Sequence, residues 1–253
     1  MSRELNGTSG QLIYPIPASG GTNPGSSAWS ALLVMKVMTS SNVWMSLMEV
    51  ETSGGNLEAG FGHQPGAGGL QVWYESNAAW EIGHNFADTD GWMVLGVSKP
   101  VGTANAIGHK CVIGGTNTHT TAANARPDPA SCASGNLRIG GNADFAPIRV
   151  AAAAFWVGTS VANATFDTIA STKTTAAIQA ASPTWLVDDS DDLVNDLVGT
   201  QDKGSEAGAT HSTDNPSGWV FGVGAPAVNG NSLISGGGVP VGVIMKHAIA
   251  TRS

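Results

Sequence analysis

Charged residues are scarce in this sequence. Asp, Glu, Lys and Arg together make up 12 % of the 253 residues, which is about half of the usual share near 25 %. The balance is acidic, because 19 Asp and Glu outnumber 11 Lys and Arg and give a formal net charge of −8. No cluster of Lys and Arg occurs along the chain. The sequence therefore predicts no nucleic-acid partner held through phosphates and no binding to an anionic membrane surface.

Long apolar runs are also missing. No window reaches the roughly 18 consecutive apolar residues that a membrane-spanning helix needs. The opening MSRELNGTSG lacks the apolar stretch of a secretory signal peptide. We therefore expect neither membrane insertion nor export by a signal-peptide-dependent secretion route.

Cysteine occurs only twice, at Cys111 and Cys132. Without a signal peptide, two reduced thiols are the simplest expectation, and a disulfide that closes one loop is the alternative. His109 and His119 lie near by in the sequence. A zinc site is not favoured, because no C-x-x-C or H-x-x-x-H spacing links these residues.

Glycine, by contrast, is abundant, with 34 residues of 253 against a usual share of about 7 %. Hydrophobic residues reach 42 %, which is enough for an ordered core. Many glycines combined with few charges are typical of a turn-rich β protein. Short apolar or alternating runs between turn residues predict strands over 27–38, 41–52, the first part of 56–69, 70–76, 78–86, 92–100, 109–115 and 137–141.

Two segments carry clear turn or loop signals. RELNGTSGQLIYPIP places Asn-Gly between apolar flanks, a combination that predicts a β-hairpin. Residues 116–136 are rich in Thr, Asn, Ala and Pro, and we expect one long loop there. Loops of that length inside a compact domain usually serve binding or contacts.

The run of four alanines at 151–154 favours helix, but its β-branched and aromatic neighbours favour strand. The run is shorter than the about 12–15 residues that an isolated helix needs, so we predict a strand over 148–156. Small residues there would let a second sheet pack closely. One face of this strand is expected to hold Ile148, Val150, Ala152, Ala154 and Trp156, and the other Arg149, Ala151, Ala153 and Phe155.

A helix is expected over 165–181, interrupted near Lys173 so that two short helices result. The tail from 218 onward contains two apolar runs separated by Gly-rich turns.

Taken in order, several segments resemble the laminin-G-like, concanavalin A-like jelly-roll domains. ELNGTSGQLIYPIP resembles their opening strand, and SAWSALLVMKV resembles the following strand with its tryptophan. DTDGWMVLGVSK resembles the Asp-Gly-x-Trp strand, and LRIGG the Leu-x-Ile-Gly strand. IRVAAAAFWVGTSVANATFDTIAS resembles the closing strand with its short helix, and DLVGTQDKGSEAGAT the Asp-Leu-x-Gly tail of such domains in bacteriophage virion proteins.

This resemblance implies an all-β fold, a two-sheet antiparallel jelly-roll sandwich with Greek-key connections and short helices near 165–181. The domain would cover 1–225, followed by a Gly-rich part, 226–253, that completes the sheet or contacts a neighbour. The resemblance further implies a non-enzymatic structural protein of a bacteriophage virion, assembled in the host cytoplasm and exposed on tail or capsid. Other virion proteins are then the expected partners, and the virion axis favours a homo-oligomer.

Glu49 and Glu51 stand two apart on one predicted strand. Glycoside hydrolases of the resembled fold use Glu-x-Asp-x-(x)-Glu, in which two of the carboxyls act as nucleophile and acid. Here Glu51 replaces the Asp, and Ser53-Gly54 stand where the third acid belongs. We therefore expect two solvated strand carboxylates and no enzymatic activity. Gly-x-Ser-x-Gly, His-Glu-x-x-His and Walker motifs are also missing from the sequence.

Two tryptophans in polar surroundings are candidates for glycan binding. Trp73, beside Gln71 and Glu75, and Trp80, beside a predicted turn, have the surroundings on which sugar rings stack. A place in the core or in a protein interface is the other interpretation. A carbohydrate-binding module for host attachment is thus the main alternative function, and a glycan hydrolase of the same fold is the second.

The acidic run at 188–192 offers Asp188, Asp189 and Asp191 as oxygen ligands for Ca²⁺. We consider Ca²⁺ mainly because proteins of the resembled fold family often bind it. The same acids equally fit the N-cap and first turn of a helix. No other cofactor is expected.

Overall fold

The computed structural model describes residues 2–17, 21–22, 24–39, 45–52, 57–64, 69–74, 78–82, 87–102, 104–122, 135–141 and 144–222. Met1–Val223 forms one compact unit and Gly224–Ser253 another, and the account below concerns the first. The expected C-terminal part, 226–253, lies outside the described residues. A search of those described found no helix with the length and apolar character to cross a membrane.

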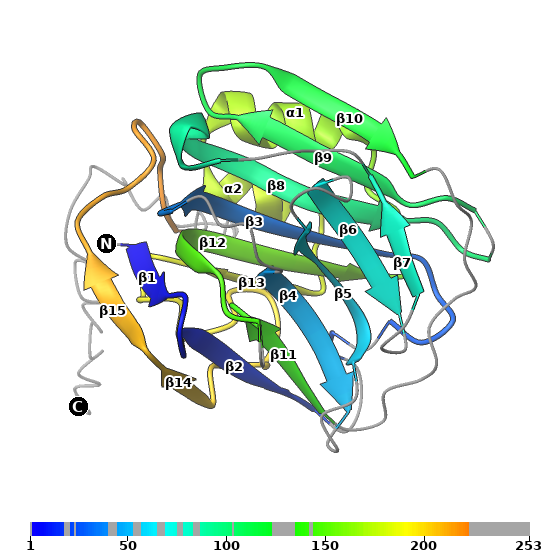
Figure 1. Ribbon diagram of the computed structural model, residues 1–253, viewed down its shortest axis with the longest axis horizontal. Coiled ribbons are helices and arrows are strands. Elements are labelled where there is room, and N and C mark those ends of the chain that lie inside the picture. Colours follow the sequence, from blue (N-terminus) through cyan, green and yellow to red (C-terminus); the bar gives the residue numbers. More distant parts are fainter. Residues whose placement is uncertain are drawn as a thin grey trace, which may run out of the picture. The chain divides into compact units, whose positions relative to one another are not determined.

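Two antiparallel sheets build this unit (Figure 1). Sheet A has the order β10-β9-β8-β3-β12-β1-β15, with β13 also paired to β12. Its strands are β1 (Ser2–Asn6), β3 (Trp29–Val37), β8 (Trp92–Lys99), β9 (Ile107–Val112), β10 (Asn117–Thr121), β12 (Pro147–Val157), β13 (Trp185–Asp188) and β15 (Ala209–Ser212). Sheet B has the order β14-β2-β11-β4-β5-β6-β7. Its strands are β2 (Gln11–Ile16), β4 (Met45–Thr52), β5 (Leu57–Gln64), β6 (Gly69–Tyr74), β7 (Ala78–Glu81), β11 (Gly135–Ile139) and β14 (Ser205–Ala207).

The predicted all-β fold with two stacked antiparallel sheets is confirmed, and so are the strands predicted around β3 to β9 and β11. Helices are few: η1 (Asp88–Asp90), α1 (Asn163–Thr172) and α2 (Thr175–Ala180). The break between α1 and α2 falls where it was predicted, since Lys173 adopts a left-handed φ of 56°.

Apolar side chains form two layers, one on each face of sheet A. Strand β3 shows the division most simply, because its alternate residues enter different layers. Leu33 and Met35 belong to the main core between the sheets. Leu32 and Val34 belong to a second layer that also contains Phe166 of α1. The helices therefore cover the face of sheet A that points away from sheet B (Figure 1).

The alanine run is extended, as predicted, and lies in β12. Its faces differ from the prediction because the register against β3 shifts between Val150 and Ala152. A bulge of this kind inserts one extra residue and exchanges the faces of the strand beyond it. Before the bulge, Ile148 and Val150 enter the main core; after it, Ala153 and Phe155 do.

The expectation that Ile148, Val150, Ala152, Ala154 and Trp156 share one face is therefore wrong. Beyond the bulge, Ala152, Ala154 and Trp156 lie in the second layer, against the helices. The small side chains consequently make room mainly for the helices, whereas we had expected them to admit the other sheet.

The predicted N-terminal hairpin is also wrong. Its turn forms as expected, with Asn6 Oδ1 accepting from the backbone N–H groups of Thr8 and Ser9, each at 2.9 Å. Gly7 has the positive φ, 69°, that this turn requires. The flanking strands, however, enter different sheets, because β1 pairs with β12 and β15 while β2 pairs with β11 and β14. The turn reverses the chain, but distant strands supply the partners.

Residues 117–121 form β10, which pairs with β9, so the prediction of a single loop over 116–136 is wrong at its start. Threonines at three of these five positions suit an extended strand. The middle of the predicted loop, 123–134, lies outside the described residues.

Candidate functional site

The predicted glycan-binding positions lie at the β6–β7 end of sheet B. The register sets Trp80 opposite Val72, and Trp73 opposite Ala79. Directly opposed residues share a face of a sheet, and Val72 belongs to the main core. Positions 71 and 73 therefore lie on the outer face, whereas position 80 lies on the core face. The side chains of Gln71, Trp73 and Trp80, and all of Glu75, are outside what the structure describes.

Glu49 and Glu51 lie on β4 and are not solvated, so that expectation is wrong. Their exposed fractions are 7 % and 2 %. Glu51 Oε1 accepts from Arg138 Nε of the neighbouring strand β11, and Asn136 Nδ2 donates to the same oxygen at 3.3 Å. The Arg138 side chain in turn donates to Gln11 Oε1 at 2.6 Å. The carboxylate of Glu51 thus belongs to an ion pair between strands of sheet B.

Burial raises the pKa of Glu49, and the nearby Glu51 carboxylate raises it further. A carboxyl with a raised pKa beside a second carboxyl is an arrangement also found in glycosidases. Neither group is exposed enough for a polysaccharide to reach it. The pair therefore resembles the two carboxyls of a glycosidase in its arrangement, but it is not accessible to a substrate.

The acidic run begins at the end of β13 and continues into a loop. Asp188 accepts from the backbone N–H of Ser190 at 2.9 Å and from that of Gly222 at 2.6 Å. Asp191 accepts from the N–H groups three and four residues further on, at 3.3 and 2.9 Å. Asp189 is 8 % exposed. The carboxylates of Asp188 and Asp191 thus fasten the backbone of this segment.

These contacts do not fit a calcium site, which needs several carboxylate oxygens directed at one point. The N-cap interpretation is wrong as well, because the stretch 185–204, all of it described, contains a strand and turns and no helix. Within the described residues, ligand atoms of three His, Cys, Asp or Glu side chains come together at one place, away from this run.

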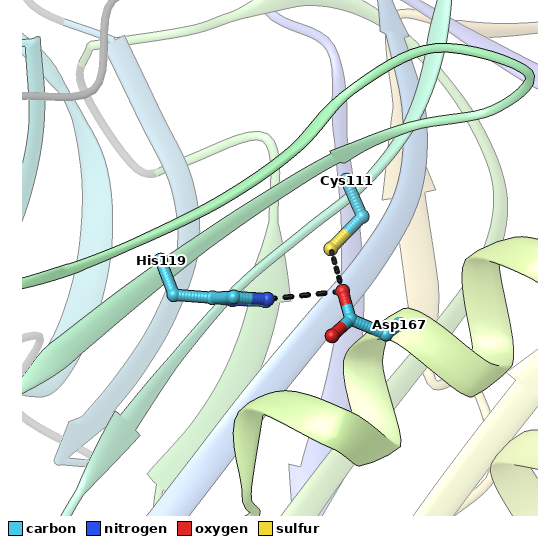
Figure 2. Close-up of side chains that lie close together, drawn as sticks. All are labelled: Cys111, His119 and Asp167. Carbon is cyan, nitrogen blue, oxygen red and sulfur yellow. Dashed lines mark hydrogen bonds and ion pairs between the residues drawn. The ribbon is translucent and has the colours of Figure 1, made fainter.

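That place is formed by Cys111, His119 and Asp167, hereafter the Cys-His-Asp cluster (Figure 2). Their ligand atoms all lie within 4.8 Å of one another. His119 Nε2 is 3.0 Å from Asp167 Oδ1, and Cys111 Sγ is 3.9 Å from the same oxygen. Cys111 is fully buried, whereas the side chains of His119 and Asp167 are 15 % and 43 % exposed. The cluster therefore extends from the interior to the surface.

Three elements bring these side chains together. Cys111 lies on β9 and His119 on β10, and the register of this hairpin sets His119 opposite His109. Asp167 comes from α1, which packs over the hairpin through the preceding residue, Phe166. The Phe166 ring stacks on the ring of His109 with centroids 3.8 Å apart.

A glycine lets α1 approach this closely. A Cβ at Gly96 of β8 would come within 2.6 Å of Phe166 Cε1 and within 2.4 Å of the Ala31 carbonyl oxygen. Real Cβ atoms do not approach other atoms so closely. Gly96 thus admits the ring of Phe166, and with it the helix that carries Asp167.

Hydrogen bonds connect the cluster to the interior of the second layer. His119 Nδ1 lies 2.9 Å from His109 Nδ1, and His109 Nε2 lies 2.9 Å from Ser98 Oγ. Ser98 Oγ donates to the carbonyl oxygen of Val161 at 2.7 Å. His109 and Ser98 are both fully buried. We call this series, from Asp167 to Val161, the histidine relay.

Cys111 is a free thiol. Burial raises its pKa to about 12, and the charge of Asp167 contributes to that shift. At neutral pH the group is therefore protonated and is not a nucleophile. Cys132, its expected partner in the alternative disulfide, lies outside the described residues.

The sequence brought Cys111, His109 and His119 into consideration but not Asp167. Alternation along 107–112 and 117–121 could have shown that positions 109, 111, 117 and 119 share one face. Asp167 has no such local signal, because only the packing of α1 brings it near.

Comparison of the sequence with models of known protein families and with curated proteins finds no match. The function of the chain therefore has to be argued from its own residues.

Proposed function

We propose that this chain is a non-enzymatic structural protein of a bacteriophage virion, built on a concanavalin A-like jelly roll and exposed on tail or capsid. The proposal is supported by the positions, in the two sheets, of the segments that resemble the concanavalin A-like domains. They supply β1, β3, β8 and β12, which are neighbours in sheet A, and β2 and β11, which are neighbours in sheet B. Segments scattered along the chain thus occupy adjacent positions in both layers, as shared descent from such a domain would require.

The path of the chain supports the jelly roll. Successive strands change sheet at β1–β2, β2–β3, β3–β4, β7–β8, β10–β11, β11–β12, β13–β14 and β14–β15. Jelly rolls are antiparallel double sheets in which the chain crosses repeatedly between layers. Hairpin connections alone would have kept consecutive strands in one sheet.

A non-enzymatic role is supported by the state of the reactive groups. Glu49 and Glu51 are almost fully buried, and Glu51 is paired with Arg138. The Cys111 thiol holds its proton. We expect no polysaccharide turnover by the wild-type chain. Turnover that Glu49→Gln abolished would instead establish the hydrolase of the same fold.

The structural role is tested on purified particles. Particles from a producing culture would be banded in a density gradient and their proteins quantified by mass spectrometry against isotope-labelled peptides of this chain. The proposal predicts a fixed number of copies per particle, in the multiple that the symmetry of tail or capsid sets. An abundant host cytoplasmic protein serves as the carry-over control. The proposal would be contradicted if the copy number of this chain per particle were no higher than that of the host control protein.

A carbohydrate-binding module for host attachment is the second candidate. It is favoured by the β6 register, which places positions 71 and 73 together on the outer face of sheet B near the β7 end. Tryptophan and glutamine at these two positions are the residue types on which a sugar ring stacks and to which it hydrogen-bonds.

A glycan array with the full chain tests this candidate. Trp73→Ala is expected to lower binding about tenfold, roughly the loss of 1.4 kcal/mol that a good anchor supplies. Phe at position 73 retains an aromatic face and is the matched control. An array without signal for the wild type, or binding indifferent to Trp73→Ala, would eliminate this function.

A further inference from the structure

The direction of each hydrogen bond in the histidine relay follows from its buried end. The Val161 carbonyl only accepts, so the Ser98 hydroxyl 2.7 Å away must donate to it. A hydroxyl has one proton, so at the 2.9 Å contact between Ser98 Oγ and His109 Nε2 the ring nitrogen is the donor.

The same argument continues to His119. His109 is fully buried, where a charged ring would be costly, and a neutral ring carries one N–H. Because Nε2 of His109 carries that proton, its Nδ1 accepts, and His119 Nδ1, 2.9 Å away, donates to it. The free lone pair of a neutral His119 is consequently on Nε2.

This lone pair meets a carboxylate oxygen. His119 Nε2 lies 3.0 Å from Asp167 Oδ1, which also accepts from Asn117 Nδ2 at 2.7 Å and from the Cys111 thiol at 3.9 Å. Two acceptors so close repel each other unless a cation lies between them. The cation is either a proton on Nε2 or a metal ion bound by all three atoms.

We propose that Cys111, His119 and Asp167 bind one divalent transition-metal ion of the zinc type through Sγ, Nε2 and a carboxylate oxygen. Sulfur, imidazole and carboxylate are the ligands that Zn²⁺ takes, and thiolate excludes Ca²⁺ and Mg²⁺. In a tetrahedral site with bonds of about 2.0–2.3 Å the ligand atoms are roughly 3.3–3.6 Å apart. The observed separations of 3.0 and 3.9 Å lie on either side of that range, and all three ligand atoms lie within 4.8 Å of one another.

The histidine relay has the form that supports such a site. Metal-ligating histidines donate their other ring nitrogen to a fixed acceptor, which sets the tautomer and aims the ligand. Here His109 is that acceptor, and Ser98 fixes His109. On binding, the Cys111 S–H bond breaks as the sulfur–metal bond forms, the proton passes to solvent, and the ion loses bound water. The bound ion joins β9, β10 and α1.

Cobalt titration of the full chain tests the site. Chain freed of metal with a chelator would be titrated with Co²⁺, whose bond to a thiolate gives a charge-transfer absorption in the near ultraviolet. We expect saturation at one ion per chain, and displacement of the band by Zn²⁺.

Three variants locate the ligands. Cys111→Ser should abolish the charge-transfer band, and Asp167→Asn, on an exposed part of α1, should raise the apparent Kd at least about tenfold. Cys132→Ser, which alters the other cysteine, is the matched control and should bind as the wild type does. Circular dichroism of each variant verifies that the fold is retained.

Three results would overturn the proposal. They are a wild type that takes up no stoichiometric Co²⁺, a band that Cys132→Ser removes and Cys111→Ser keeps, and an Asp167→Asn variant with unchanged affinity. The first would leave a protonated His119 paired with Asp167 as the account of the cluster.

Discussion

At the scale of single residues, the few charges of this chain are gathered into groups with several partners. Asp214 is one centre of such a group, because it accepts from Lys36 Nζ at 2.8 Å and from Trp92 Nε1 at 3.1 Å, and also pairs with Arg149. Lys36, Trp92 and Arg149 belong to β3, β8 and β12. One carboxylate thus ties the segment after β15 to three strands of sheet A.

Asp214→Asn is expected to remove a pH-dependent part of the stability. Burial alone would raise the pKa of Asp214, but the hydrogen bonds from Lys36, Trp92 and Arg149 outweigh it and lower the pKa from 3.8 to about 2. A depressed pKa contributes stability above pH 4 that is lost as the pH falls through about 2. The side chain is 33 % exposed, so screening reduces the contribution to about 1–2 kcal/mol.

Urea denaturation of wild type and Asp214→Asn between pH 2 and 7 measures this. The difference in the free energy of unfolding should be constant above about pH 4 and shrink below it. A difference that is the same at pH 2 and pH 7 would show that Asp214 is not held ionised by its partners.

Glu49 and Glu51 are expected to respond in opposite directions to the same substitution. Because burial raises the pKa of Glu49, its ionised form costs stability, increasingly as the pH rises above the ordinary value of 4.5. Glu49→Gln should therefore raise the free energy of unfolding at pH 7 by about 0.5–1 kcal/mol. Glu51→Gln leaves Arg138 without its carboxylate and should lower that free energy by about 2–4 kcal/mol.

Denaturation of both variants at pH 7 decides this, each being the control for the other. Changes near zero in both variants would mean that both carboxylates are solvated, as the sequence had led us to expect.

At the scale of secondary-structure elements, β12 depends on small side chains beyond its bulge. Ala152 is fully buried in the layer beneath the helices. Ala152→Leu should overfill that layer and cost about 1–3 kcal/mol. Ala176→Leu, on the exposed side of α2, should change the stability by no more than about 0.5 kcal/mol. Thermal denaturation compares the two, and similar effects would contradict the assignment of faces.

Gly96 sets the distance between α1 and sheet A. Gly96→Ala places a methyl group against Phe166 and the Ala31 carbonyl and should cost about 1–3 kcal/mol. Phe166→Leu in the same chain removes one of these contacts, so the double variant should lose less than the sum of the single ones. Strictly additive losses in a double-mutant cycle would mean that the methyl group and the ring do not meet.

The sequence predicted strands and the helix break well, because these depend on neighbours along the chain. The alternation of β3 and the break at Lys173 are local patterns. The bulge in β12 was not predicted, since none of the four alanines differs from its neighbours in polarity. The face of each alanine is decided by β3, with which β12 pairs.

At the scale of the whole molecule, the pairing of strands could not be predicted from residues that are neighbours in the sequence. β1 lies between β12 and β15, whose paired residues are 147–150 and 209–212. The Asn-Gly turn gave no sign of this, because a turn determines only the path of its own few residues. The Cys-His-Asp cluster has the same origin, since Asp167 follows from the packing of a helix on a distant hairpin.

The expected stacking of two sheets could be reached from the sequence because several segments resembled one family in one order. Each segment by itself fits many β proteins, and their order carries the proposal of a virion jelly roll.

Electron cryomicroscopy of the intact particle tests that proposal most directly. The account predicts, at a resolution that separates strands, a sandwich of sheets A and B with α1 and α2 on the outer face of sheet A, repeated about the axis of a tail or over a capsid. A particle whose density is fully explained by other chains, with no place for this sandwich, would contradict it.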